Sequence, residues 1–239
     1  MPLRTRRERQ HAQDQAVARD GHDHQGNMYD LINCNITRLL GTVDRSDIDE
    51  YVWMIRELHN YDVSQHREFQ QRYCSYWALN GAGLGQPFRS AYFSRLEQAK
   101  CSPEQATVER ITWTLYETPI NAKEKKALQF SFASKLVHMV NPSLPVYDRM
   151  VESFYFLPRS YTGTPEKKLA NLLRSYGFLV SEYDRILREG LLAPAIDELR
   201  GHFQLPTDYS DHKIIDTLIW KFVPFLESGA VRDGSVVYG

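Results

Sequence analysis

The sequence has few cysteines, and they lie far apart. Cys34, Cys74 and Cys101 are the three cysteines among 239 residues, and no two of them form a Cys-x-x-Cys pair. This spacing excludes the zinc and iron–sulfur centres that are built on such pairs, and we expect neither a metal nor another cofactor. Because the number is odd and the spacing wide, we expect free thiols and a reducing, cytoplasmic location.

Long apolar runs and a large excess of charge of one sign are also missing. No stretch approaches the ~20 apolar residues that a membrane-spanning helix needs, so we expect a soluble protein without a membrane partner. The N-terminal arginines precede no apolar segment, so we expect no secretory signal. The 29 basic and 30 acidic residues nearly cancel. Binding to nucleic acid would therefore have to rest on a local patch of charge.

Residues 1–27 predict a basic tail that precedes a helical domain over residues 28–239. The tail has few apolar residues to bury, which is typical of segments that do not order by themselves. Its arginines are either a solvated feature of a chain terminus or a contact for phosphates. They are Arg4, Arg6, Arg7, Arg9 and Arg19.

From residue 28 onward, apolar residues recur with the spacing of helices, and the chain predicts an all-α fold. Stripes of this kind cover residues 31–40, 48–58, 69–77, 88–99 and 108–116. We expect further helices at 124–140, 149–157, 166–176, 180–189, 192–203 and 211–227. Strand signals are scarce, and only Ser235–Tyr238 reads as extended.

One of these helices carries a narrow polar stripe. Residues 127–140 are apolar around most of the helix, which indicates a buried position. The exceptions are Ser131, Ser134, Lys135 and His138, whose spacing puts them on one face. Because a lysine and a histidine need partners or water, we expect this face to line a wet cleft. The alternative is an ordinary amphipathic helix with a narrow solvated face.

A short loop after this helix ends in an aspartate. Pro145 keeps Leu144 out of helical geometry, and Asp148 stands where the N-cap of the next helix belongs. The loop thus brings a carboxylate close to the polar stripe. Asp148 could be a plain cap or a functional carboxylate, and one role does not exclude the other.

The segment resembles the active-site stretch of helix-hairpin-helix DNA glycosylases. In that family a hairpin is followed by a helix that often opens with a lysine, and then by a loop ending in Val-Asp. Phe132-Ala133-Ser134-Lys135-Leu136 is similar to the helix, and Pro145-Val146-Tyr147-Asp148 is similar to the loop. The likeness covers about residues 108–155. The chain departs from the family in having no glycine in the hairpin region, and its spacing between lysine and aspartate is shorter than in the lyase-active members.

This resemblance implies a two-lobed helical domain with a central cleft, acting as a monomer on double-stranded DNA that holds a damaged or modified base. Asp148 would stabilise the sugar cation, and Lys135 would act as an amine nucleophile, hold a phosphate or position Asp148. Phosphate contacts would come from the lysines upstream, from Ser134 and from His138. Aromatic residues near in sequence would wall the base pocket. The lysines are Lys123, Lys125 and Lys126, and the aromatic residues are Trp113, Tyr116, Phe132 and Tyr147.

Three functions remain open at this point. The first is a DNA glycosylase, either for repair or for defence against phages whose DNA carries modified bases. The second is a non-catalytic DNA-binding module in which Asp148 only caps a helix. The third is a helical scaffold that binds a partner protein. Salt-dependent DNA binding would separate the third from the first two.

Overall fold

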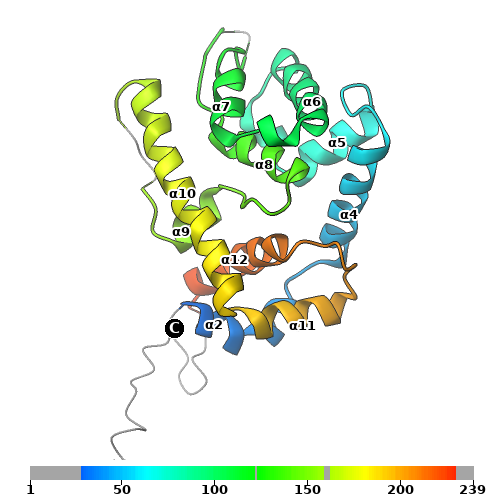
Figure 1. Ribbon diagram of the computed structural model, residues 1–239, viewed down its shortest axis with the longest axis vertical. Coiled ribbons are helices and arrows are strands. Elements are labelled where there is room, and N and C mark those ends of the chain that lie inside the picture. Colours follow the sequence, from blue (N-terminus) through cyan, green and yellow to red (C-terminus); the bar gives the residue numbers. More distant parts are fainter. Residues whose placement is uncertain (1–27, 122, 159–161, 230–239) are drawn as a thin grey trace, which may run out of the picture.

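The computed structural model describes residues 28–121, 123–158 and 162–229 (Figure 1). Within these ranges the chain folds as helices and contains no strand, so the predicted all-α class is confirmed. The predicted tail over 1–27 and the extended Ser235–Tyr238 lie outside the described residues. The described α-helices are α2 (Met28–Cys34), α3 (Ile36–Leu40), α4 (Arg45–Asn60), α5 (Arg67–Tyr76), α6 (Gln86–Cys101), α7 (Val108–Tyr116), α8 (Phe130–Val140), α9 (Arg149–Phe154), α10 (Pro165–Glu189), α11 (Ala193–Phe203) and α12 (Asp211–Glu227). Short 3-10 helices cover Leu79–Ala82 and Pro103–Gln105.

Two of the expected helix boundaries were wrong for local reasons. The helix expected from residue 124 begins only at Phe130, because Glu124 has a φ of 54° and the Ile120 N–H donates to the Lys125 carbonyl at 2.8 Å, which closes a turn. The break expected between 176 and 180 is absent, and α10 runs through Gly177 without interruption. A glycine inside a helix costs only about 0.5–1 kcal/mol, which packing along the rest of α10 offsets.

The helices form two groups in the ribbon view (Figure 1). In one group, α8 packs against both α6 and α7, and α5 lies beside them. In the other group, α12 packs against α9, α10 and α11, with α2 and α3 against α11. Helix α4 contacts α5 at one end and reaches toward α12 at the other (Figure 1). The two groups are therefore connected by α4 on one side and by the α8–α9 loop, which lies between them.

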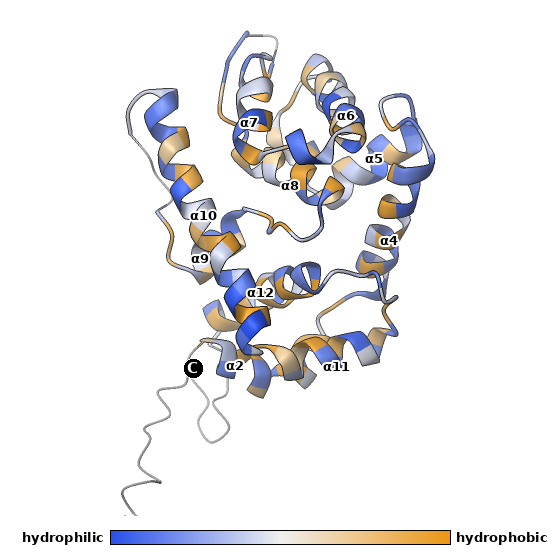
Figure 2. Ribbon diagram, viewed as in Figure 1, coloured by the Kyte–Doolittle hydropathy of each residue, from blue (hydrophilic) through white to orange (hydrophobic). Residues whose placement is uncertain are grey.

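A single hydrophobic core runs through both groups. It includes fully buried residues from many of the helices, such as Leu58, Tyr92, Leu136, Tyr183 and Ile215. Figure 2 shows hydrophilic and hydrophobic bands alternating along α10, as expected for a helix that buries one face. Over the described ranges, no helix combines the length and the apolar character needed to cross a membrane.

Candidate functional site

A pocket of about 620 Å³ lies where α4, α5, α8 and α12 come together, and the start of α9 completes it. Its size falls in the range of pockets that enclose small organic ligands. Four aromatic side chains contribute to its walls, namely Tyr76, Trp77, Tyr209 and Trp220. Lys135 and Asp148 both line it as well. The structure thus brings the two residues singled out from the sequence into one pocket.

Lys135 extends into this pocket from the middle of α8. Its side chain is buried, and its Nζ donates a hydrogen bond to the Trp77 carbonyl oxygen at 3.1 Å. The ammonium also lies 5.8 Å from the centre of the Trp77 ring and 5.2 Å from that of Phe132. Burial lowers the pKa of Lys135, and the nearby Asp148 carboxylate opposes this shift without cancelling it.

Asp148 is the N-cap of α9 and uses one carboxylate oxygen for that purpose. Its Oδ1 accepts hydrogen bonds from the backbone N–H groups of Met150 at 2.9 Å and Val151 at 3.1 Å. Its Oδ2 accepts none from the described residues. Burial raises the pKa of Asp148, and the neighbouring Asp216 carboxylate raises it further. Capping and chemistry can therefore be divided between the two oxygens of one side chain.

The charges around the pocket are balanced, with four acidic and four basic residues. Three pairs account for six of them. Arg72 pairs with Glu50, Lys213 lies 2.8 Å from Asp216, and Lys221 lies 3.6 Å from Asp47.

Lys135 and Asp148 are the remaining two, and neither has an ion-pair partner within 4.0 Å among the described residues. Buried charges are normally paired, because leaving water is costly for an ion. Lys135 and Asp148 line one pocket but are too far apart to form an ion pair. Such a pair of opposite charges is typical of a site that binds a ligand.

Lys213 and Asp216 on α12 are pocket residues that the sequence analysis missed. The Lys213 ammonium lies 5.0 Å from the centre of the Trp77 ring and 5.3 Å from that of Tyr51. Burial lowers the pKa of Lys213, but Asp216, Tyr209 and Tyr51 together outweigh burial and leave this pKa raised, so Lys213 stays charged. On the mostly apolar α12, the spacing i, i+3, i+7 puts Lys213, Asp216 and Trp220 on one face, as it does for Ser131, Ser134 and His138 on α8. Looking for a polar stripe on α12 as well would therefore have found Lys213 and Asp216.

The prediction that the whole polar stripe of α8 faces a wet cleft was wrong. Lys135 reaches the pocket, but Ser134 and His138 are fully buried against the loop over 141–148. The Ser134 hydroxyl donates to the Ser131 carbonyl at 2.9 Å and accepts from the Tyr147 N–H at 2.9 Å. The loop folds back over α8 and takes up the polar groups that we expected water or DNA to meet.

His138 fastens the same loop. Its Nδ1 is 2.7 Å from the Leu144 carbonyl, which can only accept, so Nδ1 carries the proton and donates. Its Nε2 then accepts from the Tyr51 hydroxyl at 3.0 Å. Burial lowers the pKa of His138 to about 4, which keeps the ring neutral in this arrangement. Ser134 and His138 are therefore residues that position Asp148, and the predicted contacts of both with DNA phosphates do not fit this burial.

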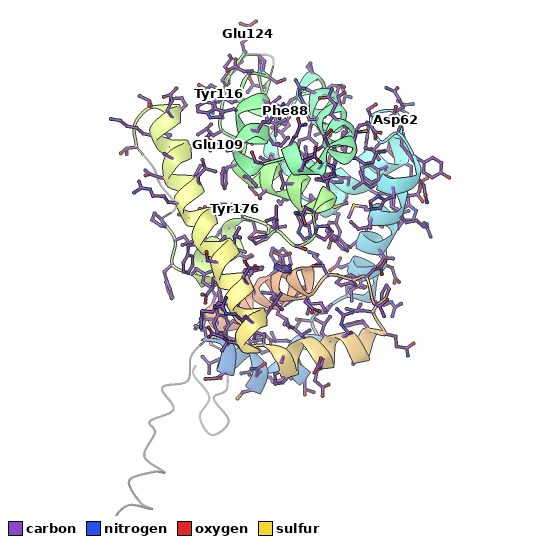
Figure 3. All side chains as sticks on the ribbon, viewed as in Figure 1. Asp62, Phe88, Glu109, Tyr116, Glu124 and Tyr176 are labelled. Carbon is purple, nitrogen blue, oxygen red and sulfur yellow. The ribbon has the colours of Figure 1, made fainter. Side chains whose placement is uncertain are left out.

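The aromatic residues expected around the base pocket lie elsewhere. Trp113 and Tyr116 stack edge-to-face on α7, and Figure 3 labels Tyr116 well away from α12. The Tyr147 ring packs at 5.1 Å against Phe130, and Phe132 belongs to the hydrophobic core, with its ring 5.2 Å from the Lys135 ammonium. None of the four predicted residues lines the pocket. Proximity in sequence misled here, because the aromatic walls come from segments far along the chain.

The three lysines upstream of α8 lie on an exposed connection between α7 and α8. Lys123, Lys125 and Lys126 are all exposed, and the Lys126 Nζ is 2.8 Å from Glu117. Helices α7 and α8 pack against each other across this connection. The binding of these lysines to DNA phosphates stays a prediction.

Comparison of the chain with protein-family models, with curated proteins and with solved structures finds no match.

Proposed function

We propose that this protein is a DNA glycosylase, which excises a damaged or modified base after flipping it into the pocket of Lys135 and Asp148. The observation that carries the proposal is a buried lysine and a partly buried aspartate in an aromatic-walled pocket, opposite in charge and without ion-pair partners among the described residues. A two-lobed arrangement with this pocket as the central cleft, and a monomer as the acting form, belong to the same proposal. The sequence resemblance around Lys135 and Asp148 agrees with it.

The pocket suits an uncharged planar ring. Its four acidic and four basic residues sum to zero, so nothing in it selects for a strongly charged group. Aromatic faces such as those of Tyr76 and Trp77 stack on any base, and an enzyme that acts on a glycosidic bond must take the base out of the duplex. A volume of about 620 Å³ accommodates a nucleobase and part of its sugar.

Asp148 would act at the sugar. Breaking the bond between the sugar C1′ and the base nitrogen leaves positive charge on the ring, and the base departs with the bonding electron pair. The Oδ2 of Asp148 would stabilise that charge and orient a water molecule, whose oxygen then bonds to C1′. The water gives one proton to the departing base and keeps one in the new sugar hydroxyl.

Lys135 would have a second role in the same pocket. Its lowered pKa increases the share of neutral amine, which is the form that can attack C1′. We expect weak lyase activity from this route beside hydrolysis through Asp148. The exposed Lys123, Lys125 and Lys126 would hold the DNA backbone outside the pocket.

The test exposes the protein to ordinary, alkylated and oxidised DNA, and to phage DNA that carries modified cytosines. Abasic sites are then counted with an aldehyde-reactive probe. Abasic sites in one kind of DNA support the proposal and decide between repair and phage defence. If none of these DNAs gains abasic sites and the protein does not bind DNA at low salt, the proposal fails in favour of a scaffold that binds a partner protein.

The three exposed lysines give an independent check on DNA binding. Replacing Lys123, Lys125 and Lys126 by glutamine removes up to three positive charges from the phosphate backbone. The slope of the logarithm of the binding constant against the logarithm of salt concentration should then become shallower by about 0.9 for each lysine that binds a phosphate in the wild-type protein. An unchanged slope would mean that these lysines do not touch phosphates.

A further inference from the structure

One carboxylate oxygen in the pocket has no partner. Asp216 lines the pocket and is 5% exposed, and its Oδ2 is 2.8 Å from the Lys213 ammonium. Its Oδ1 is buried and accepts no hydrogen bond from the residues that the structure describes. A buried acceptor without a donor is costly, so such groups in a native protein normally meet a ligand or a water molecule.

A buried hydrogen-bond donor of the pocket also lacks a partner. Trp77 also lines the pocket, and its indole Nε1–H is buried without an acceptor among the described residues. The Lys213 ammonium connects the two, since it pairs with Asp216 and lies 5.0 Å from the centre of the Trp77 ring. The pocket therefore offers one acceptor and one donor around a fixed positive charge.

This pattern is complementary to one edge of a nucleobase. We propose that Asp216 and Trp77 are specificity-determining residues that read the base: Asp216 Oδ1 accepts from an amino N–H, and Trp77 Nε1 donates to the ring nitrogen beside it. The substrate class is then a base with a free exocyclic amino group next to an unsubstituted ring nitrogen, as in adenine-like and cytosine-like bases. This inference rests on the proposed function, because it takes the ligand of the pocket to be a base.

Free bases test this recognition without DNA and without chemistry. Calorimetric titrations compare adenine with N6,N6-dimethyladenine, and cytosine with N4,N4-dimethylcytosine. Dimethylation removes the donor that Asp216 needs and leaves the ring nitrogen in place. The wild-type protein is expected to bind each amino base about tenfold or more tightly than its dimethylated analogue, because the buried oxygen is left without a partner again.

Variants separate hydrogen bonding from the added bulk of two methyl groups. In the double variant Lys213→Met with Asp216→Leu, an apolar pair of similar size replaces the ion pair, a change that proteins usually tolerate. Its preference for the amino base should vanish, whereas a steric effect would persist. In Trp77→Phe both ligands should bind more weakly while the preference remains. Trp113→Phe, on α7 and outside the pocket, is the matched control and should change neither affinity nor preference.

Each outcome decides the proposal. A wild-type preference that disappears only in the double variant supports it. Equal binding of amino and dimethylated bases, a preference that survives in the double variant, or no binding of any base up to its solubility limit overturns it. Failure of the proposed function is distinguishable, because a protein that binds amino bases selectively but forms no abasic sites in DNA reads a base without cleaving it.

Discussion

The buried ion pair of Lys213 and Asp216 should show a large energetic coupling. Both side chains are about 6% exposed and lie 2.8 Å apart. Lys213→Met alone leaves a buried carboxylate without its cation, and Asp216→Leu alone leaves a buried ammonium without its anion. Removing one partner of such a pair typically costs about 3–5 kcal/mol of the free energy of unfolding, whereas replacing both partners by apolar residues is often neutral or stabilising. The double variant should therefore be more stable than either single variant by about 3 kcal/mol or more.

Urea unfolding followed by circular dichroism at neutral pH measures these differences. The matched control is the second lysine–aspartate pair of the pocket, Lys221 and Asp47, which are 3.6 Å apart with Asp47 55% exposed. Lys221→Met, Asp47→Leu and their combination should show a coupling of about 0–1 kcal/mol, because water screens this pair. If the effects of Lys213→Met and Asp216→Leu simply add, the pair is not coupled by burial and our reading of the pocket charges is wrong.

Three further predictions concern Lys135, His138 and Asp148. Asp148→Asn should leave the free energy of unfolding within about 0.5 kcal/mol, because asparagine caps helices as well as aspartate, while Asp148→Ala should cost about 1 kcal/mol in urea unfolding; equal losses would refute the capping role. Borohydride should trap a covalent complex of the protein with its DNA product through Lys135. Trapping should persist in the double variant Lys213→Met with Asp216→Leu and be lost in Lys135→Met, whereas the reverse pattern would assign the amine to Lys213. The pKa of His138 is about 4 in the folded protein, below its ordinary value of about 6.5. The unfolded chain therefore binds a proton at His138 more readily than the folded protein does. The free energy of unfolding should fall by roughly 3 kcal/mol as the pH drops from about 6.5 to 4. Urea unfolding between pH 7 and 4 should show this loss in the wild-type protein, and a His138→Gln protein that loses as much would contradict it.

The sequence allowed the fold class and the two central charges to be predicted, because both depend on local patterns. Helical spacing of apolar residues is local, and α12 was predicted with its observed bounds, Asp211–Glu227. The closeness of Lys135 and Asp148 also follows from a short loop between neighbouring helices.

The pocket walls could not be predicted in this way. The four aromatic residues of the walls come from α5, from α12 and from the segments beside them, and only the whole fold brings these parts to one pocket: Tyr76, Trp77, Tyr209 and Trp220. Likewise, the face of α8 that we expected to meet water is buried at His138, because the following loop covers it. The spacing of apolar residues along a helix does not indicate which of its faces a loop will cover. Aromatic residues close in sequence were therefore a poor guide to the walls of the pocket.

The most direct test of the central claim is the rate at which abasic sites form with Asp148→Asn. The matched control is Asp44→Asn, since Asp44 is the N-cap of α4, accepts from the Ser46 N–H at 2.8 Å and is exposed outside the pocket. With the DNA on which the wild-type protein forms abasic sites, Asp148→Asn should be slower by about 100-fold or more while remaining folded, and Asp44→Asn should act at the wild-type rate. A folded Asp148→Asn protein that forms abasic sites at the wild-type rate would contradict the account.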